Sequence, residues 1–92
     1  MMFTLETSAK FKKDAKRYQS DEKAKHIITT VISLLLTGKP LPAEYKEHKL
    51  IGDYVGYLEC HGRPDLLLIY RRDTENKVIK LYRVGSHSHL FK

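Results

Sequence analysis

The chain has 92 residues, of which 41% are hydrophobic and 30% charged, and its formal net charge is +6. This length allows one modest core, so we expect residues 1–92 to form a single domain. The composition excludes a low-complexity or disordered chain, and the positive charge favours an acidic partner such as nucleic acid.

The sequence also favours a cytoplasmic protein. Cys60 is the single cysteine, so no internal disulfide can form, and its apolar surroundings indicate a buried structural thiol. The N-terminal stretch contains Glu6 and no long apolar run, which argues against a signal peptide. No apolar run is long enough to cross a membrane, so no membrane partner is expected.

A short strand followed by a helix is predicted at the N-terminus. Apolar and polar residues alternate over residues 3–7, and Ser8 is placed to cap a helix over residues 9–18. Apolar side chains share one face of this helix. The opposite face is basic and consists of Lys12, Lys13, Lys16 and Arg17. This basic face is either a solvated surface or a contact for RNA phosphates.

A second helix, with a wide apolar stripe, is predicted to cover the core. Ser20 or Asp21 can cap it, and it should end near Thr37. Gly38 suits a left-handed C-cap, and Pro40 prevents the helix from continuing. The short link between the two helices predicts an antiparallel helical hairpin.

The second half of the chain predicts three antiparallel strands. Residues 41–53 read as an irregular loop that contains His48, and strands are expected over residues 54–61, 66–70 and 77–84. The order strand, helix, helix and three strands indicates an α+β fold. Helices would cover one face of the sheet and leave the other open as a basic ligand-binding concavity.

The C-terminal segment is dense in functional groups. Strand alternation predicts that Arg83 shares a side with Ile79 and Leu81, where a sheltered guanidinium requires an anionic partner. His87 follows a turn at the end of this strand, and Phe91 can stack on a base.

One chemistry that fits these groups is RNA cleavage without a metal. A base takes the proton of the ribose 2′-OH, and an acid protonates the leaving 5′-oxygen. His48 or Asp65 can serve as the base and His87 as the acid. Arg83 can clamp the phosphate through paired hydrogen bonds.

Two other readings of the same residues remain open. His87 and His89 could ligate zinc together with His61 and Asp65, but the spacing matches no standard zinc motif and no cysteine pair is present. The histidines could also be scattered over the surface without a shared role. We expect no metal and no cofactor.

The second half of the chain also resembles a known family. The segments AEYKEHKLIGDYVGYLECHGRPDLLLIY and LYRVGSHSHLF resemble the RelE/ParE superfamily of bacterial toxins, and the YafQ-type mRNA interferases within it. The resemblance extends over nearly the whole chain, because FKKDAKRY and the LPAEYKEHKL loop also occupy corresponding places. The combination of a His before the L-x-G loop with CH-x-x-PD and R-x-G-[ST]-H-x-x-LF is specific, whereas no single piece would be.

The resemblance implies two N-terminal helices packed on an antiparallel sheet. It implies a toxin that cuts mRNA in the ribosomal A site, and a cognate antitoxin that neutralises it in a hetero-oligomer. The family's functional positions match His48, His61, Asp65, Arg83, His87 and Phe91. Leu66 stands where the YafQ type has a tryptophan, which leaves codon preference and rate open.

Two alternatives differ in function rather than in fold. ParE-type members poison DNA gyrase by binding, although the His, Asp and Arg groups of this chain argue for acid/base chemistry. A basic RNA-binding module without catalysis would bind RNA with a steep dependence on salt.

Overall fold

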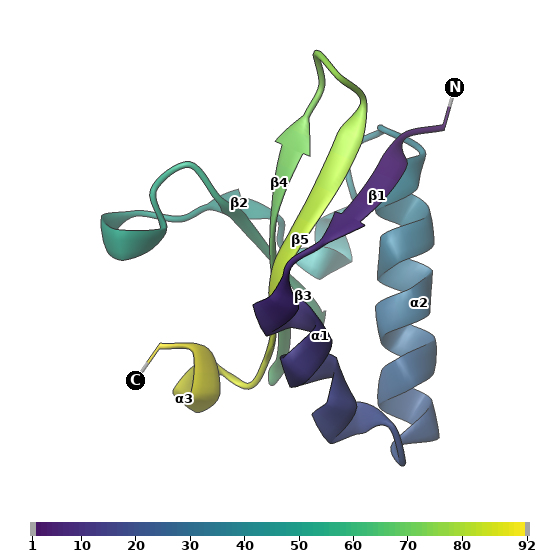
Figure 1. The fold of residues 1–92 in the computed structure, drawn as a ribbon, viewed down its shortest axis with the longest axis vertical. Coiled ribbons are helices and arrows are strands. Elements are labelled where there is room, and N and C mark those ends of the chain that lie inside the picture. Colours follow the sequence, from purple (N-terminus) through teal and green to yellow (C-terminus); the bar gives the residue numbers. More distant parts are fainter. Residues whose placement is uncertain (1, 92) are drawn as a thin grey trace.

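A five-stranded sheet lies at the centre of the protein, in a computed structural model that describes residues 2–91. The strand order is β1-β5-β4-β3-β2 (Figure 1). The strands are β1 (Thr4–Thr7), β2 (His48–Lys49), β3 (Leu58–Arg63), β4 (Leu66–Asp73) and β5 (Val78–Gly85). The helices are α1 (Ala9–Ala15), α2 (Glu22–Leu36) and α3 (His87–Leu90), and short 3-10 turns are η1 (Lys16–Tyr18), η2 (Ala43–Tyr45) and η3 (Gly52–Tyr54). The predicted α+β class is confirmed.

The sheet is mixed rather than wholly antiparallel. β1 lies at one edge and pairs in parallel with β5, with Thr4 opposite Val78 and Thr7 opposite Leu81. The expectation of an antiparallel sheet holds for β2 to β5 and is wrong for β1. The physical reason is that α1 and α2 carry the chain from β1 to β2 at the opposite edge of the sheet. The antiparallel strands β2 to β5 then return to β1, and β5 arrives beside it in the same direction.

Both long helices begin where a polar side chain satisfies free backbone N–H groups. Ser8 Oγ accepts from the N–H of Phe11 at 2.9 Å, and Asp21 Oδ1 accepts from the N–H of Ala24 at 3.0 Å. After α2, Gly38 has φ 76°, and a Cβ there would lie 2.5 Å from the Phe3 ring. The predicted caps and the left-handed glycine are confirmed.

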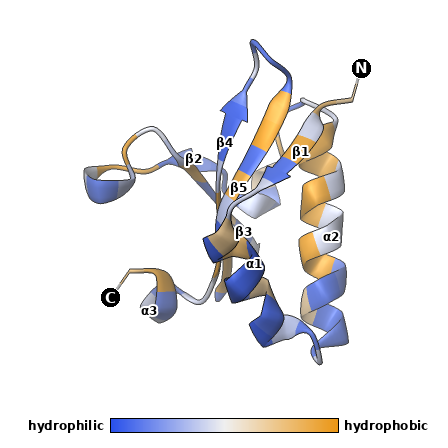
Figure 2. Ribbon diagram, viewed as in Figure 1, coloured by the Kyte–Doolittle hydropathy of each residue, from blue (hydrophilic) through white to orange (hydrophobic). Residues whose placement is uncertain are grey.

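The main core lies between the sheet and α1 and α2, and we call this side of the sheet the helix face. The buried apolar residues of α2 pack there against alternate residues of β4. They are Ala24, Ile28, Val31 and Leu35 on α2, and Leu66, Leu68 and Tyr70 on β4. Each large side chain buried here contributes roughly 1.5–3 kcal/mol. Figure 2 shows hydrophobic residues along most of α2 and hydrophilic residues in its N-terminal turns.

A second, smaller apolar cluster covers part of the opposite side, which we call the open face. Leu67 and Ile69 of β4 point to it and pack against the buried Leu90 of α3. Burial on both sides explains the continuous apolar run of β4 and confirms that it is a central strand. Within residues 2–91 the structure has no helix with the length and apolar character of a membrane span.

Three predicted boundaries were wrong, and one of them is the end of β4, which continues to Asp73 instead of ending at residue 70. The loop over residues 41–53 is not irregular throughout, because His48 and Lys49 pair with β3 as the short strand β2. The strand expected from residue 54 begins only at Leu58. Gly56 has φ 93°, a conformation that interrupts an extended run and that glycine adopts most readily.

The side predicted for Arg83 was also wrong. Tyr70 lies opposite Leu81, but Ile69 lies opposite Arg83, so β5 has one extra residue at Tyr82. This bulge reverses the alternation that Ile79 and Leu81 had established. Arg83 therefore leaves the strand on the open face, with Ile69.

Candidate active site

A carboxylate between two imidazoles occupies the outer part of the open face. Glu59 on β3 is directly opposite His48 on β2, and His61 follows two positions later on the same face of β3. Glu59 Oε1 lies 3.2 Å from His48 Nε2 and 3.5 Å from His61 Nε2. The Glu59 side chain is only 6% exposed, against 48% for His48 and 31% for His61. The structure therefore brings together two predicted site residues and adds Glu59, which the sequence reasoning missed.

The tautomer of His48 follows from its second ring nitrogen. His48 Nδ1 lies 2.8 Å from the backbone carbonyl of Lys46. A carbonyl can only accept a hydrogen bond, so Nδ1 carries a proton there. Nε2 therefore faces the Glu59 carboxylate either as a lone pair or with a second proton.

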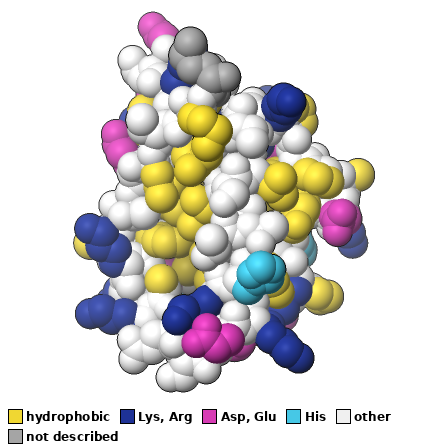
Figure 3. Space-filling model, turned by 90° about the vertical axis from the view of Figure 1, so that its right-hand side faces the viewer, with side chains coloured by type: hydrophobic (Ala, Val, Ile, Leu, Met, Phe, Trp, Pro, Cys, Tyr) yellow, Lys and Arg dark blue, Asp and Glu magenta, His cyan; other side chains and the backbone are white. Residues whose placement is uncertain are grey.

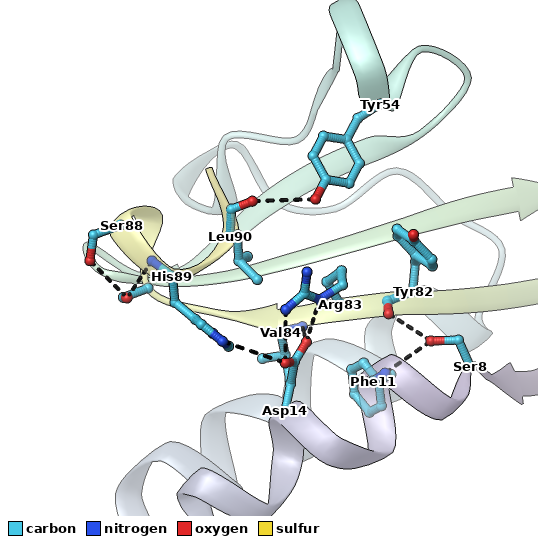
Figure 4. Close-up of polar contacts among 11 residues, drawn as sticks. Ser8, Phe11, Asp14, Tyr54, Tyr82, Arg83, Val84, Ser88, His89 and Leu90 are labelled. Carbon is cyan, nitrogen blue, oxygen red and sulfur yellow. Dashed lines mark hydrogen bonds and ion pairs between the residues drawn. The ribbon is translucent and has the colours of Figure 1, made fainter. Parts of the chain in front are cut away.

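A buried ion pair supports the central part of the site. Arg83 Nε and Nη2 donate to Asp14 Oδ2 and Oδ1 at 2.7 and 3.0 Å, and the backbone N–H of Val84 donates to Oδ2 at 3.2 Å (Figure 4). Asp14 comes from α1, so this pair ties the helix to the end of β5. The sequence prediction of an anionic partner for Arg83 is confirmed, although that partner is a carboxylate of the chain itself.

The ion pair changes the acidity of both groups. Burial raises the pKa of Asp14, but the hydrogen bonds from Arg83 and from the Val84 N–H outweigh it, and the net pKa lies below the usual value. The hydrogen bond to Asp14 raises the pKa of Arg83 despite its partial burial. Both groups are therefore charged at neutral pH.

Helix α3 presents His87 at the end of β5. Ser86 Oγ accepts from the N–H of His89 at 3.2 Å, and Asp65 Oδ1 accepts from the N–H of His87 at 3.0 Å. The His87 and Phe91 rings lie 5.0 Å apart between centroids. His87 is exposed. Asp65, His87 and Phe91 are thus brought together, with Asp65 bonded to the backbone of His87.

His89 lies away from this exposed ring. Its Nε2 is 3.9 Å from Asp14 Oδ1, and its ring packs so closely on Gly85 that a Cβ there would lie 2.8 Å from Nδ1. The predicted zinc ligands His87 and His89 therefore point to different surroundings. Among residues 2–91, the group whose donor atoms converge is His48, Glu59 and His61 instead.

Strand β4 separates two halves of the site. One half is the cluster of His48, Glu59 and His61, and the other contains Arg83 and His87. Ile69 pairs with Glu59 on one side and with Arg83 on the other, and Leu67 pairs with His61 and with Gly85. Adjacent strands lie about 4.8 Å apart, so Glu59 and Arg83 are separated by roughly 10 Å at their backbones. Tyr54 lies at the Phe91 side of this gap, with ring centroids 5.5 Å apart. Between the two halves, Leu67 and Ile69 are buried and pack against Leu90 of α3.

The remaining sequence expectations concern the basic face of the first helix and the position of Leu66. All four residues of the basic face, Lys12, Lys13, Lys16 and Arg17, are exposed on α1 and η1. The neighbouring Asp14 is buried, so the same helix carries a basic surface and a partner of Arg83. Leu66 is fully buried in the core on the helix face, so it does not line the open face.

The missed residues left different traces in the sequence. Glu59 and His61 form an E-x-H pair on one face of a strand, which could have been read as a shared site. Asp14 left no such trace, because it is an acid within a lysine-rich helix and its partner lies 69 residues away.

The fold and these residues match known proteins along nearly the whole chain. The sequence model for bacterial toxins of type II toxin–antitoxin systems, YafQ, matches residues 3–92. The mRNA interferase toxin YafQ of Escherichia coli strain K12 is 37% identical over 91 residues, which is 95% of this chain and 94% of that protein.

Solved structures show the same architecture. The toxin in the crystal structure of the E. coli DinJ-YafQ toxin–antitoxin complex superposes with a TM-score of 0.86 at 34% identity, with full coverage of both chains. A metal-bound toxin from Helicobacter pylori superposes with a TM-score of 0.86 at 41% identity, over 98% of this chain and 100% of that one. The fold is therefore that of RelE-like toxins. The chain belongs to the YafQ family of type II toxin–antitoxin systems.

Proposed function

We propose that this cytoplasmic chain is an mRNA interferase that cuts mRNA on the ribosome with acid/base groups of its open face. The observation that supports the proposal best is Glu59, which lies between two imidazoles and in register with Arg83 across β4. The name of the E. coli relative, mRNA interferase toxin YafQ, agrees with it.

In the proposed reaction, Glu59 accepts the proton of the ribose 2′-OH. Its Oε2 has no hydrogen-bond partner among the described residues, but the atom is buried, so the 2′-OH reaches it only when the neighbouring side chains of His48 and His61 move aside. The 2′-oxygen then forms a bond to the adjacent phosphorus, and the bond from phosphorus to the 5′-oxygen breaks. The products are a 2′,3′-cyclic phosphate and a 5′-OH end. This assignment replaces His48 or Asp65 as the base and gives His48 and His61 the role of holding Glu59.

His87 is the proposed acid for the leaving 5′-oxygen. Its ring is exposed beside Phe91, and the bond from its N–H to Asp65 fixes the start of α3. We assign Asp65 the role of positioning His87. Arg83 uses two of its N–H groups for Asp14, and the remaining ones can stabilise the charge that develops on the phosphate.

An aromatic and basic surface beside the site fits a single RNA strand. The rings of Tyr57 and Tyr82 lie 4.9 Å apart, and Tyr54 lies 6.1 Å from Tyr82. Arg71 lies over the Tyr57 ring and Lys10 over the Tyr82 ring, at 5.2 and 5.5 Å from the centroids. Exposed aromatic faces next to cations bind bases and phosphates without strict sequence preference. We therefore propose that mRNA extends from Phe91 across this surface.

Two further surfaces are assigned to macromolecular partners. We propose that the basic face of α1 and η1 contacts ribosomal RNA. On the other side, α2 leaves Ile27, Ile32 and Leu34 only partly buried, and Figure 3 shows a strip of hydrophobic side chains there with basic side chains near its lower end. The relative YafQ was crystallised with DinJ, and we propose an acidic antitoxin as the partner of this chain as well.

Primer extension on ribosome-bound mRNA tests the proposed activity. The parent should produce discrete cuts, and His87→Ala should remove them, while circular dichroism shows an unchanged fold because His87 is exposed. His26→Ala is the matched control, since His26 is exposed on α2. Full cleavage by His87→Ala would exclude the mechanism. DNA breaks without cut transcripts after induction would point to gyrase instead.

A further inference from the structure

Strand β2 carries His48 but is too short to hold its own position. It pairs with β3 through two residues, with His48 opposite Glu59 and Lys49 opposite Leu58. The turn η2 leads into it through Lys46, which has a left-handed conformation with φ 51°. A residue with a side chain adopts this conformation at a cost, so other contacts must hold the segment in place.

Those contacts come from Glu47, the residue directly before β2. Its Oε2 accepts from Tyr70 Oη at 2.6 Å and from Arg72 Nε at 2.7 Å, and its Oε1 accepts from Arg72 Nη2 at 3.2 Å. Arg72 Nη2 also donates to the backbone carbonyl of Lys39, after α2, at 3.2 Å. The side chains of Glu47 and Arg72 are only 17% and 14% exposed. We call Glu47, Tyr70 and Arg72 the Glu47 clamp, and it ties the start of β2 to β4.

Glu47 lies between the two residues that determine how His48 faces Glu59. The carbonyl of Lys46 accepts a hydrogen bond from His48 Nδ1 at 2.8 Å, and His48 Nε2 lies 3.2 Å from Glu59 Oε1. Successive side chains of an extended chain point to opposite faces, so a Glu47 that is anchored on the helix face directs His48 to the open face. The clamp therefore fixes both the carbonyl that sets the tautomer of His48 and the backbone that carries its ring.

The geometry of the clamp makes it rigid. A carboxylate that accepts two parallel N–H bonds from one guanidinium is held in direction as well as in distance. The buried hydroxyl of Tyr70 adds a third direction to the same carboxylate of Glu47. A neutral side chain in place of Glu47 would lose the charge-assisted bonds and leave the guanidinium of Arg72 without its anion.

We propose that Glu47 is a positioning residue of the active site, held by Arg72 and Tyr70, which acts through His48 on Glu59. The orientation of His48 by the clamp stands on the contacts alone, whereas its effect on cleavage rests on the proposed function.

A fixed backbone at His48 limits what has to move when RNA binds. The buried Oε2 of Glu59 is reached only when the rings of His48 and His61 move aside. With the clamp intact, the His48 ring can turn about its own side-chain bonds while β2 stays paired with β3. Without the clamp, β2 can separate from β3 and Glu59 loses its neighbour. A shift of about 1 Å at a reacting group can slow a reaction about 10²-fold.

NMR of the imidazole nitrogens in the free toxin tests the orientation without RNA. Above about pH 8 the rings are mostly neutral, and His48 of the parent should carry its proton on Nδ1. Glu47→Gln should show both tautomers of His48, because the carbonyl of Lys46 is no longer held. The signals of His26 and His87 are internal references and should not change. Parental signals of His48 in Glu47→Gln would overturn the positioning role.

Single-turnover cleavage of ribosome-bound mRNA tests the effect on the reaction. Glu47→Gln should lower the maximal rate about 10- to 100-fold and leave the half-saturating concentration unchanged, because the clamp does not face the RNA. Arg72→Lys keeps the charge but lacks the paired N–H groups, so it should lower the maximal rate less. Asp73→Asn is the control for stability, since the carboxylate of Asp73 bonds to Asn76 in the turn after β4. It should cut at the parental rate.

Circular dichroism and urea denaturation compare the stability of these variants, and Arg72→Lys takes the place of Glu47→Gln in both experiments if the latter does not fold. A parental maximal rate in Glu47→Gln, or an equal fall in Asp73→Asn, would refute the effect on the reaction. A weaker half-saturation with an unchanged maximal rate would also refute it, because Glu47 would then act in RNA binding. If the parent itself does not cut RNA, the proposed function fails, while the NMR experiment still decides the orientation of His48.

Discussion

Glu59 and Arg83 are paired with the same residue, Ile69, from opposite sides of β4. Both side chains therefore point to the open face, one strand away from the centre on either side. In the proposed function, a phosphodiester bridges the base and the cation across this separation. The bulge at Tyr82 is essential to this relationship, because without it Arg83 would point to the helix face.

Replacing Glu59 by Gln tests the assignment of the base. The amide keeps the shape of the side chain but takes up a proton poorly, so single-turnover cleavage of ribosome-bound mRNA should fall about 10²–10⁴-fold. His26→Gln should cut at the parental rate. Cleavage by Glu59→Gln within a few-fold of the parent would eliminate Glu59 as the base.

Asp14→Asn should destabilise the protein by about 1–3 kcal/mol. The variant loses the charged hydrogen bonds of Arg83 and leaves a guanidinium that is only 17% exposed without its anion. Urea denaturation followed by circular dichroism measures the change. Lys25→Gln is the control, since its exposed ion pair with Glu22 contributes about 0.5 kcal/mol or less. Equal stability of Asp14→Asn and the parent would contradict a supporting role for the pair.

Acidification should weaken the fold through Asp14 and Glu47. Burial raises the pKa of Glu47, but hydrogen bonds from Arg72 and Tyr70 outweigh it, and the net pKa is below the usual 4.5. The net pKa of Asp14 is also below its usual 3.8. Because both pKa values are lower in the folded state, their stabilisation is complete above the unfolded values and is lost as pH falls through the folded ones.

The urea midpoint should therefore change little between about pH 7 and pH 5.5 and fall steeply below about pH 4.5. In Asp14→Asn the fall should be shallower, because Asp14, one of the carboxyls whose pKa is lowered, is gone. A urea midpoint that rises as the pH falls below 4 would show that ionised Asp14 and Glu47 do not stabilise the folded state.

Charge reversal on the basic face separates ribosome binding from chemistry. Lys12→Glu with Lys16→Glu should reduce co-sedimentation with ribosomes, since each reversed charge removes a phosphate contact and adds a repulsion. Lys23→Glu with Lys25→Glu makes the same change in net charge on exposed positions of α2. Stability should be similar in both double variants. Equal co-sedimentation of the two would show that net charge, and not this surface, governs the association.

Tyr57→Ser tests the aromatic surface. A stacked base contributes about 1–3 kcal/mol, so affinity for a single-stranded RNA with 2′-deoxy substitution at the cut site should fall about 5- to 150-fold. Arg71→Gln should weaken binding mainly at low salt, because it removes one charge. Tyr45→Ser is a control for the loss of a partly buried tyrosine elsewhere. Parental affinity in Tyr57→Ser would remove this surface from the RNA path.

The local features of the fold were readable from the chain. Ser8, Asp21 and Gly38 determine where helices begin and end through bonds to neighbouring residues, so their roles follow from sequence order. The apolar run of β4 likewise identified a strand buried on both sides. The chemical groups of the C-terminal segment were recognisable because Arg and His have few equivalents as phosphate clamp and proton donor.

Only the tertiary structure decided how those groups combine. The bulge at Tyr82 depends on pairing with β4, and it moves Arg83 to the open face. Asp14 and Arg83 meet across 69 residues, and β2 brings His48 beside the buried Glu59. The sequence by itself determined the elements and the candidate chemistry, since these depend on neighbours along the chain. Partners, burial and the side of the sheet depend on residues far apart, which only the folded packing brings together.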